Sequence, residues 1–154
     1  MTTAIHRLVD RCRAADHPAI VARLRSGWAV LGERQVFAGY CLLLPDPVVP
    51  HLNALANDAR ATFLDDMATL GDALIAATGA IRINYAMFGN AEPALHAHLF
   101  PRFGTEAAST RELQPWALDW NAALPFSEAV HGEVRRRLRA LLSGGSTPPA
   151  YPEN

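Results

Sequence analysis

The chain begins with apolar residues that recur at intervals of three or four positions. This period predicts a short amphipathic helix over residues 3–15. The expected apolar face consists of Ile5, Leu8, Val9 and Cys12. Pro18 follows, and proline inside a helix removes a backbone hydrogen bond, so the helix is expected to end before it.

Three short apolar segments come next. We expect strands over residues 19–24, 27–31 and 39–44, with a hairpin turn between the first two. The third segment contains three consecutive leucines at 42–44. A continuous apolar run is typical of a strand that is buried on both faces, so this strand is expected at the centre of the sheet.

The longest periodic segment covers about residues 58–77. Its apolar residues recur with the spacing of one helix face, which predicts a long amphipathic helix. They are Phe63, Met67, Leu70 and Leu74. Gly79 follows this stripe, and glycine is common just beyond a helix end because it accepts a left-handed conformation.

The remaining segments complete an α+β pattern. Residues 81–88 and 95–100 are predicted as strands, and residues 127–142 as a helix that Ser127 can cap. The order is three strands, the long helix, two strands and a last helix. Short links between strands favour antiparallel neighbours, so we expect an α+β domain with a mainly antiparallel sheet of about five strands.

These elements fit one domain. A chain of 154 residues can bury one core without disulfides, and all the predicted elements lie within residues 1–142. From residue 143 the composition shifts to glycine, serine, threonine and proline. We therefore expect a disordered tail over residues 143–154.

Composition narrows the classes of function. Half of the residues (50%) are apolar and 19% are charged, as in globular proteins. No apolar run is long enough to cross a membrane, and the first residues lack the apolar segment of a signal peptide. The net charge is −1, with no dominant basic surface segment, so we expect neither a membrane nor a nucleic acid as a partner.

The chain has no lysine and only two cysteines. All 14 basic residues are arginine, which excludes a phosphate-binding or Schiff-base lysine. The two cysteines, Cys12 and Cys41, form no Cys-x-x-Cys pair, which excludes a cysteine-rich zinc site. Reduced thiols favour a cytosolic protein, so we expect a cytoplasmic location.

The densest group of chemically active side chains lies within residues 90–102 and contains two histidines. His96 and His98 are two residues apart on a predicted strand, so both point to the same face. Imidazole is suited to nucleophilic and acid–base chemistry near neutral pH. Arg102 adds a fixed positive charge and is a candidate for substrate binding. Spacing alone leaves open structural histidines, a catalytic pair, or a metal site with His51 as third ligand.

Residues 83–102 resemble the signature strand pair of the histidine triad superfamily. The motif appears here as Ala-Leu-His-Ala-His-Leu-Phe-Pro-Arg over residues 94–102. Residues 39–45 are similar to the family's central strand, and the long predicted helix lies where the family has one. The resemblance covers about residues 20–103. It implies a histidine-triad-like α+β fold with one long central helix and a C-terminal helix.

The resemblance also implies roles for individual residues. His96 matches the family's nucleophile, and His98 matches the histidine that contacts the reacting phosphate. Asn84 and Asn90 lie where relatives place polar contacts to phosphate, and Glu33 lies beside the position that grips the ribose hydroxyls. These matches imply a nucleotide hydrolase or transferase that forms a nucleotidyl-histidine intermediate. Dinucleoside polyphosphates and nucleoside phosphoramidates are the implied substrates, with no cofactor and a homodimeric assembly.

This chain departs from the family pattern at the first histidine, at the zinc ligands and at Gly32, the ribose position beside Glu33. Ala94 stands where the motif has its first histidine, so the triad is incomplete and of His-x-His type. Zinc-binding members carry paired cysteines and a further histidine, whereas this chain has Cys12 alone and Val48, so no metal is expected. Two alternatives remain open, a non-catalytic nucleotide-binding module and a metal-dependent hydrolase.

An aromatic segment follows the motif. We expect Trp116, Trp120 and Phe126 to pack over the domain, and a role in closing the pocket of a partner subunit is the alternative.

Overall fold

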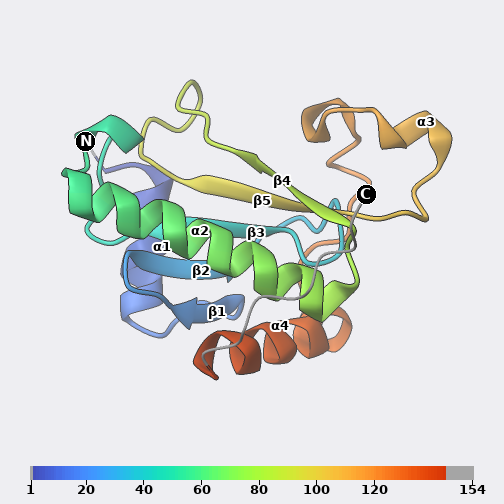
Figure 1. Cartoon of the computed structure of the whole chain (residues 1–154), viewed down its shortest axis with the longest axis horizontal. Coiled ribbons are helices and arrows are strands. Elements are labelled where there is room, and N and C mark those ends of the chain that lie inside the picture. The colour runs from blue at the N-terminus through green and yellow to red at the C-terminus, as the bar shows by residue number, and fades with distance from the viewer. Residues whose placement is uncertain (1, 145–154) are drawn as a thin grey trace.

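The computed structural model describes residues 2–144 of the chain (Figure 1). Its main elements are α1 (Ala4–Arg13), β1 (Ile20–Arg23), β2 (Gly27–Leu31), β3 (Cys41–Pro45), α2 (Asn57–Thr78), β4 (Arg82–Ala86), β5 (Ala97–Arg102) and α4 (Glu128–Ser143). Short helical turns, η1 (Leu52–Ala54), α3 (Ala108–Arg111) and η2 (Pro115–Ala117), lie in the connections and were not predicted. The predicted elements occur in the predicted order.

Within residues 2–144, the strands form one five-stranded sheet in the order β1-β2-β3-β5-β4. Every pair of neighbouring strands is antiparallel. The leucine-rich strand β3 lies at the centre, as its continuous apolar run predicts. The predicted α+β class with a mainly antiparallel sheet is confirmed.

The helices α2 and α4 cover one face of this sheet. Phe63 and Leu74 of α2 and Leu138 of α4 are fully buried in one apolar cluster with Leu43 of β3. The stripe that the sequence predicts for α2 therefore faces the core. Gly79 ends α2 with a φ of 73°, in the left-handed region expected for a glycine cap.

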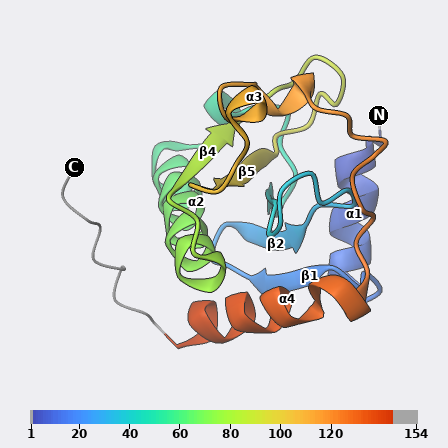
Figure 2. The ribbon, with the colours of Figure 1, turned by 90° about the vertical axis from the view of Figure 1, so that its right-hand side faces the viewer.

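The opposite face of the sheet is shared by α1 and a long connection. Ile5 and Val9 of α1 pack against Val30 and Leu44. Figure 2 shows α1 and α2 on opposite sides of the sheet. The connection over residues 103–126 covers another part of the α1 face, where its side chains join a cluster of buried aromatic rings.

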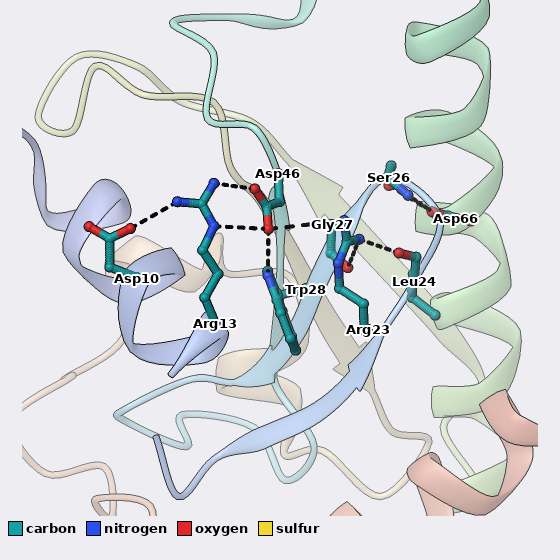
Figure 3. Close-up of polar contacts among 9 residues, drawn as sticks. All are labelled: Asp10, Arg13, Arg23, Leu24, Ser26, Gly27, Trp28, Asp46 and Asp66. Atoms are coloured by element: carbon teal, nitrogen blue, oxygen red, sulfur yellow. Dashed lines mark hydrogen bonds and ion pairs between the residues drawn. The ribbon is translucent and has the colours of Figure 1, made fainter. Parts of the chain in front are cut away.

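Two aspartates join the β1–β2 hairpin to its neighbours. Asp66 of α2 accepts hydrogen bonds from the backbone nitrogen and the hydroxyl of Ser26, each at 2.7 Å (Figure 3). Asp46, which follows β3, accepts from Nε1 of Trp28 at 2.9 Å and pairs with Arg13 of α1. These contacts hold the hairpin between α1 and α2.

Strand β5 differs from its prediction at both ends. It begins after His96 and continues through Pro101 to Arg102. Pro101 pairs with Ile83 of β4, whereas β3 pairs with β5 only as far as Leu99. Residue 101 therefore has a partner strand on one side only, where a proline is tolerated in a sheet.

The other predicted boundaries agree with the observed elements to within two residues. The last helix extends to Ser143, the first residue of the predicted tail. Residues 145–154 of that tail lie outside the described residues, and its predicted disorder stays a prediction.

Candidate functional site

The register of the sheet places His98 in a row that crosses the α1 face. Val30 of β2 pairs with Leu42 of β3, which pairs in turn with His98 of β5. On its other side His98 pairs with Ala86 of β4. Side chains of paired residues project to the same face of a sheet. The apolar surface beside α1 therefore continues directly to the imidazole of His98.

His96 lies immediately before β5 and is buried. Its Nδ1 is 2.8 Å from the carbonyl oxygen of Ala94. A carbonyl oxygen only accepts hydrogen bonds, so Nδ1 carries the proton in this contact. In the neutral ring, Nε2 then keeps its electron pair and is the nucleophilic atom. Because the acceptor belongs to the backbone, alanine at position 94 preserves this contact.

Glu92 supports the residue that orients His96. Its carboxylate accepts hydrogen bonds from the backbone nitrogen of Ala94 at 3.2 Å and from that of Ala4 at 3.0 Å. Ala4 is the first residue of α1. Glu92 therefore ties the β4–β5 connection to α1 next to His96.

His98 lies between Tyr40 and His96. Its Nδ1 is 2.6 Å from the hydroxyl of Tyr40, and its ring centroid is 4.7 Å from that of His96. Burial, followed by the influence of nearby His96, lowers the pKa of His98 to about 4. The ring is therefore neutral at pH 7 and meets an anion as a hydrogen-bond donor rather than as a cation.

Aromatic rings surround His98. Tyr40 and Phe100 stack with their centroids 4.6 Å apart. Trp116 of η2 lies nearly perpendicular to His98, with the centroids 5.3 Å apart, and Phe88 contacts Trp116 at 4.8 Å. Trp116 and Phe88 are both exposed. The exposed aromatic pair of Trp116 and Phe88 therefore lies beside His98.

The tryptophans pack over their own domain, as predicted. Trp120 lies 5.5 Å from Tyr40 between ring centroids, and its Nε1 donates to the carbonyl oxygen of Pro115 at 2.9 Å. Phe126 packs instead against the α2–α4 cluster and stacks on His131 at 5.7 Å. A contribution of this segment to the pocket of a partner subunit stays a prediction.

Two pockets lie on or near the histidine pair, and only the smaller one is lined by one of these histidines. The larger, of about 610 Å³, lies between α1 and Leu42, the residue that pairs with His98. The smaller, of about 270 Å³, includes His96 and is bordered by residues 50–53 and 87–89. The larger pocket is therefore connected to His98 through the strand neighbour Leu42.

Three predicted substrate-binding residues lie around this site. Glu33 is exposed and lines the larger pocket. Asn84 of β4 pairs with Phe100, and alternate residues of β5 share a face, so Asn84 lies on the same face as His98. Asn90 is exposed in the β4–β5 connection, next to the border of the smaller pocket.

Arg102 has internal hydrogen-bond partners. Its guanidinium is buried, and Nη2 is 2.6 Å from Oε2 of Glu106. It also donates to the carbonyl oxygens of Thr110 and Arg111 and lies over the ring of Phe37. These contacts engage most of its donors and make Arg102 an anchor for the connection after β5, while its predicted substrate contact stays a prediction.

Solved structures identify the fold. A histidine triad protein from Marinobacter aquaeolei VT8 matches with a TM-score of 0.72 and 21% identity, over 93% of this chain and 98% of its own. A hypothetical histidine triad nucleotide-binding protein from Sulfolobus tokodaii strain 7 matches with a TM-score of 0.70 and 12% identity, over 89% and 91%. A histidine triad protein from Sinorhizobium meliloti 1021 gives 0.69 and 21%, over 83% and 92%.

The chain has the histidine triad fold. Its sequence matches no family model and no curated protein, so the likeness is carried by the structure. Since one match covers 93% of the chain, the histidine triad fold extends well beyond residues 20–103, on which the sequence resemblance depends. None of the helices in the described part of the chain is long and apolar enough to cross a membrane.

The alternative metal site is not assembled in this histidine triad fold. His51 shares the smaller pocket with His96. Among the described residues, however, no group of three or more His, Cys, Asp or Glu side chains is placed to hold a metal ion. The predicted trio of His51, His96 and His98 therefore does not form a ligand set.

Tyr40 and Trp116 both contact His98. No sequence signal marked Tyr40 as a site residue, and Trp116 was expected to pack over the domain, with a role in a partner's pocket as the alternative. Each is distant from His98 along the chain, and neither belongs to the histidine triad motif as read from the sequence. Tyr40 lies within the predicted central strand, residues 39–44, but its contact with His98 can be inferred only when the register between β3 and β5 is known. That register depends on packing between segments far apart in sequence.

Proposed function

We propose that the chain is a nucleotide phosphohydrolase or nucleotidyl transferase acting at the α-phosphate. The hydrogen bond between Nδ1 of His96 and the carbonyl oxygen of Ala94 carries the proposal. It leaves Nε2 as a nucleophile beside His98, a second imidazole that can donate to a phosphate oxygen. The Sulfolobus tokodaii neighbour is described as nucleotide-binding, which supports a nucleotide as the ligand.

The proposed reaction has two steps. Nε2 of His96 attacks the α-phosphorus, a P–N bond forms, and the bond from phosphorus to the leaving group breaks. The leaving group is a nucleoside polyphosphate in a dinucleoside polyphosphate, or an amine that takes up a proton in a phosphoramidate. Water then attacks phosphorus, loses a proton and releases His96 with a nucleoside monophosphate, whereas another acceptor gives transfer. Dividing the substitution in this way replaces one difficult step by two easier ones.

The larger pocket suits the nucleoside part of such a substrate. Its volume of about 610 Å³ is within the usual range for small-molecule sites. Glu33 on its lining can accept hydrogen bonds from ribose hydroxyls. The phosphate is expected to meet neutral donors, namely His98, Asn84 and Asn90, because Arg102, the arginine of the motif, is paired internally with Glu106.

We also propose a homodimer that uses β4. This strand lies at the edge of the sheet and so has unpaired backbone groups on one side. Ile81 and Tyr85 at this edge are 62% and 44% exposed, which is unusual for large apolar side chains. A second copy of the chain would cover both features. Figure 1 shows β4 at the margin of the sheet.

The proposed function is tested by turnover of diadenosine polyphosphates and an adenosine phosphoramidate. Wild-type protein is expected to act on at least one of them in the presence of a chelator. His96→Ala is expected to lose roughly three orders of magnitude or more, as enzymes do when the nucleophile is removed. Intact-mass spectrometry should detect a nucleotidyl adduct on wild-type protein and none on the variant.

Three results would point elsewhere. Binding of nucleotide without turnover or adduct would support the binding module. Turnover that a chelator abolishes, together with loss of activity in His51→Ala, would support the metal-dependent hydrolase. Full turnover by His96→Ala would remove the nucleotidyl-histidine intermediate from the mechanism.

A further inference from the structure

Tyr40 has a fixed position at the start of β3. Its ring is only 4% exposed and stacks on Phe100. Its backbone carbonyl oxygen accepts hydrogen bonds from the backbone nitrogen of Gly32 and from Nε2 of Gln35, each at 2.9 Å. Gly39 before it has a φ of 90°, which favours glycine and turns the chain into β3. The phenol ring therefore has little freedom to move.

The hydroxyl of Tyr40 acts as a donor to His98. The oxygen lies 2.6 Å from Nδ1. Burial raises the pKa of Tyr40 well above its usual value, so the hydroxyl keeps its proton near neutral pH. Within the described residues, Nδ1 of His98 is the hydrogen-bond partner found for this hydroxyl. A buried donor without an acceptor is costly, so the hydroxyl hydrogen points to Nδ1.

We propose that Tyr40 is a positioning residue that sets the tautomer of His98. Because Nδ1 accepts the hydrogen bond, the single proton of the neutral imidazole is on Nε2. The use of this N–H as a donor to a phosphate oxygen rests on the proposed function. The tautomer itself follows from the contact between the two side chains.

The two histidines thereby have opposite tautomers. In His96, Nδ1 donates to a carbonyl oxygen, and Nε2 is free to attack. In His98, Nδ1 accepts from a phenol, and Nε2 donates. Their rings are 4.7 Å apart, so one reacting phosphate could meet a nucleophile and a donor at adjacent positions. A backbone carbonyl and a tyrosine hydroxyl thus divide the two roles between identical side chains.

Because the imidazole of His98 is neutral, the position of its single proton matters for its role. The rings that contact His98 belong to His96, Tyr40, Phe100 and Trp116, and none of them carries a carboxylate. Within the described residues, burial and His96 are the causes that lower the pKa of His98, and no carboxylate acts on it, so an imidazolium that could donate from both nitrogens is not stabilised. With one proton on the ring, its location decides whether His98 can donate to the substrate at all.

The direct test is ¹⁵N NMR of histidine-labelled protein at neutral pH, with signals assigned through His98→Asn. In the wild type, Nε2 of His98 should be protonated and Nδ1 unprotonated. In Tyr40→Phe, which keeps the stacked ring and removes the hydroxyl, this preference should disappear and the two tautomers should mix. A proton on Nδ1 of His98 in the wild type would overturn the proposal, even if the variant failed to fold.

Kinetics provide the second arm of the test. Tyr40→Phe should lower kcat by roughly tenfold, the effect of losing one aligned hydrogen bond in the transition state, with a smaller change in KM. Tyr85→Phe is the matched control, since Tyr85 packs near Gly71 of α2 on the other face of the sheet. Equal kcat values for Tyr40→Phe and Tyr85→Phe would overturn the proposal.

The two arms separate this inference from the proposed function. If wild-type protein turns over no nucleotide, the proposed function fails, while the tautomer measurement still decides the role of Tyr40. If turnover depends on His96 but the tautomer of His98 is unchanged in Tyr40→Phe, the inference fails and the proposed function stands.

Discussion

Glu106→Ala is expected to destabilise the connection that covers the aromatic side of the site. The Glu106 carboxylate accepts from Nε and Nη2 of Arg102, at 3.0 and 2.6 Å, and from the backbone nitrogen of Phe103 at 2.7 Å. Both side chains of the ion pair are buried, with 8% and 10% exposure. The variant would leave the guanidinium of Arg102 buried without its counter-ion.

The magnitude follows from this geometry. Removal of one partner from a buried ion pair typically costs about 3–5 kcal/mol. Arg102 would keep its bonds to the carbonyl oxygens of Thr110 and Arg111, so we expect the lower end, ~3 kcal/mol. For a urea m-value of about 2 kcal/mol/M, the unfolding midpoint should fall by about 1.5 M.

The stabilisation by Glu106 should also depend on pH. Hydrogen bonding to Arg102 holds the pKa of Glu106 below its usual value. A carboxylate with a lowered folded-state pKa stabilises the protein fully above its unfolded pKa, about 4.3, and loses that effect as the pH falls through the folded pKa. The difference between wild type and Glu106→Ala should therefore be constant near neutral pH and shrink in acid.

The assay is equilibrium urea unfolding, followed by tryptophan fluorescence and circular dichroism. Glu112→Ala is the control, because Glu112 is exposed on the same connection and should change stability little. Amide hydrogen exchange over residues 103–126 should be faster in Glu106→Ala than in the control. A loss below about 1 kcal/mol at neutral pH would refute the argument that this ion pair anchors the connection.

Two further predictions concern the frame of the site. Asp46→Asn keeps an acceptor for Trp28 but loses the charge paired with arginine, so stability should fall by about 1 kcal/mol. Side-chain hydrogen bonding to Arg13 lowers the pKa of Asp46, so this difference, measured by urea unfolding, should be full above the ordinary aspartate pKa and be lost as the pH falls through the lowered folded-state pKa. Ile81→Asp should convert the proposed homodimer to a monomer in analytical ultracentrifugation, and an unchanged mass would exclude this edge as the interface.

Local sequence determined the elements and their order. The apolar stripe of α2, ending before Gly79, predicts a helix because the helical period is set by the backbone and acts over a few residues. The leucine run likewise placed β3 at the sheet centre, since every one of its side chains needs burial. Strand boundaries were harder to predict from sequence. The extension of β5 through Pro101, for example, depends on pairing with the neighbouring strand β4.

The sequence also indicated the histidine pair correctly as neighbours on one face. His96 and His98 are two residues apart, and that spacing alone brings their rings together at 4.7 Å. The same local reasoning could not foresee the internal partner of Arg102. Whether an arginine beside a site faces a ligand or an internal carboxylate is decided by the path of the following connection, which brings Glu106 onto it.

Tertiary structure alone decided which distant side chains surround the imidazole of His98. The register of β3 against β5 brings Tyr40 to His98, and the folding of the later connection brings Trp116 to the same ring. Nδ1 of His96 contacts a local partner, the carbonyl oxygen of Ala94, whereas Nδ1 of His98 contacts Tyr40, which is far away in sequence. Sequence therefore names the two histidines, while the packing of segments far apart in the chain decides which side chains surround His98.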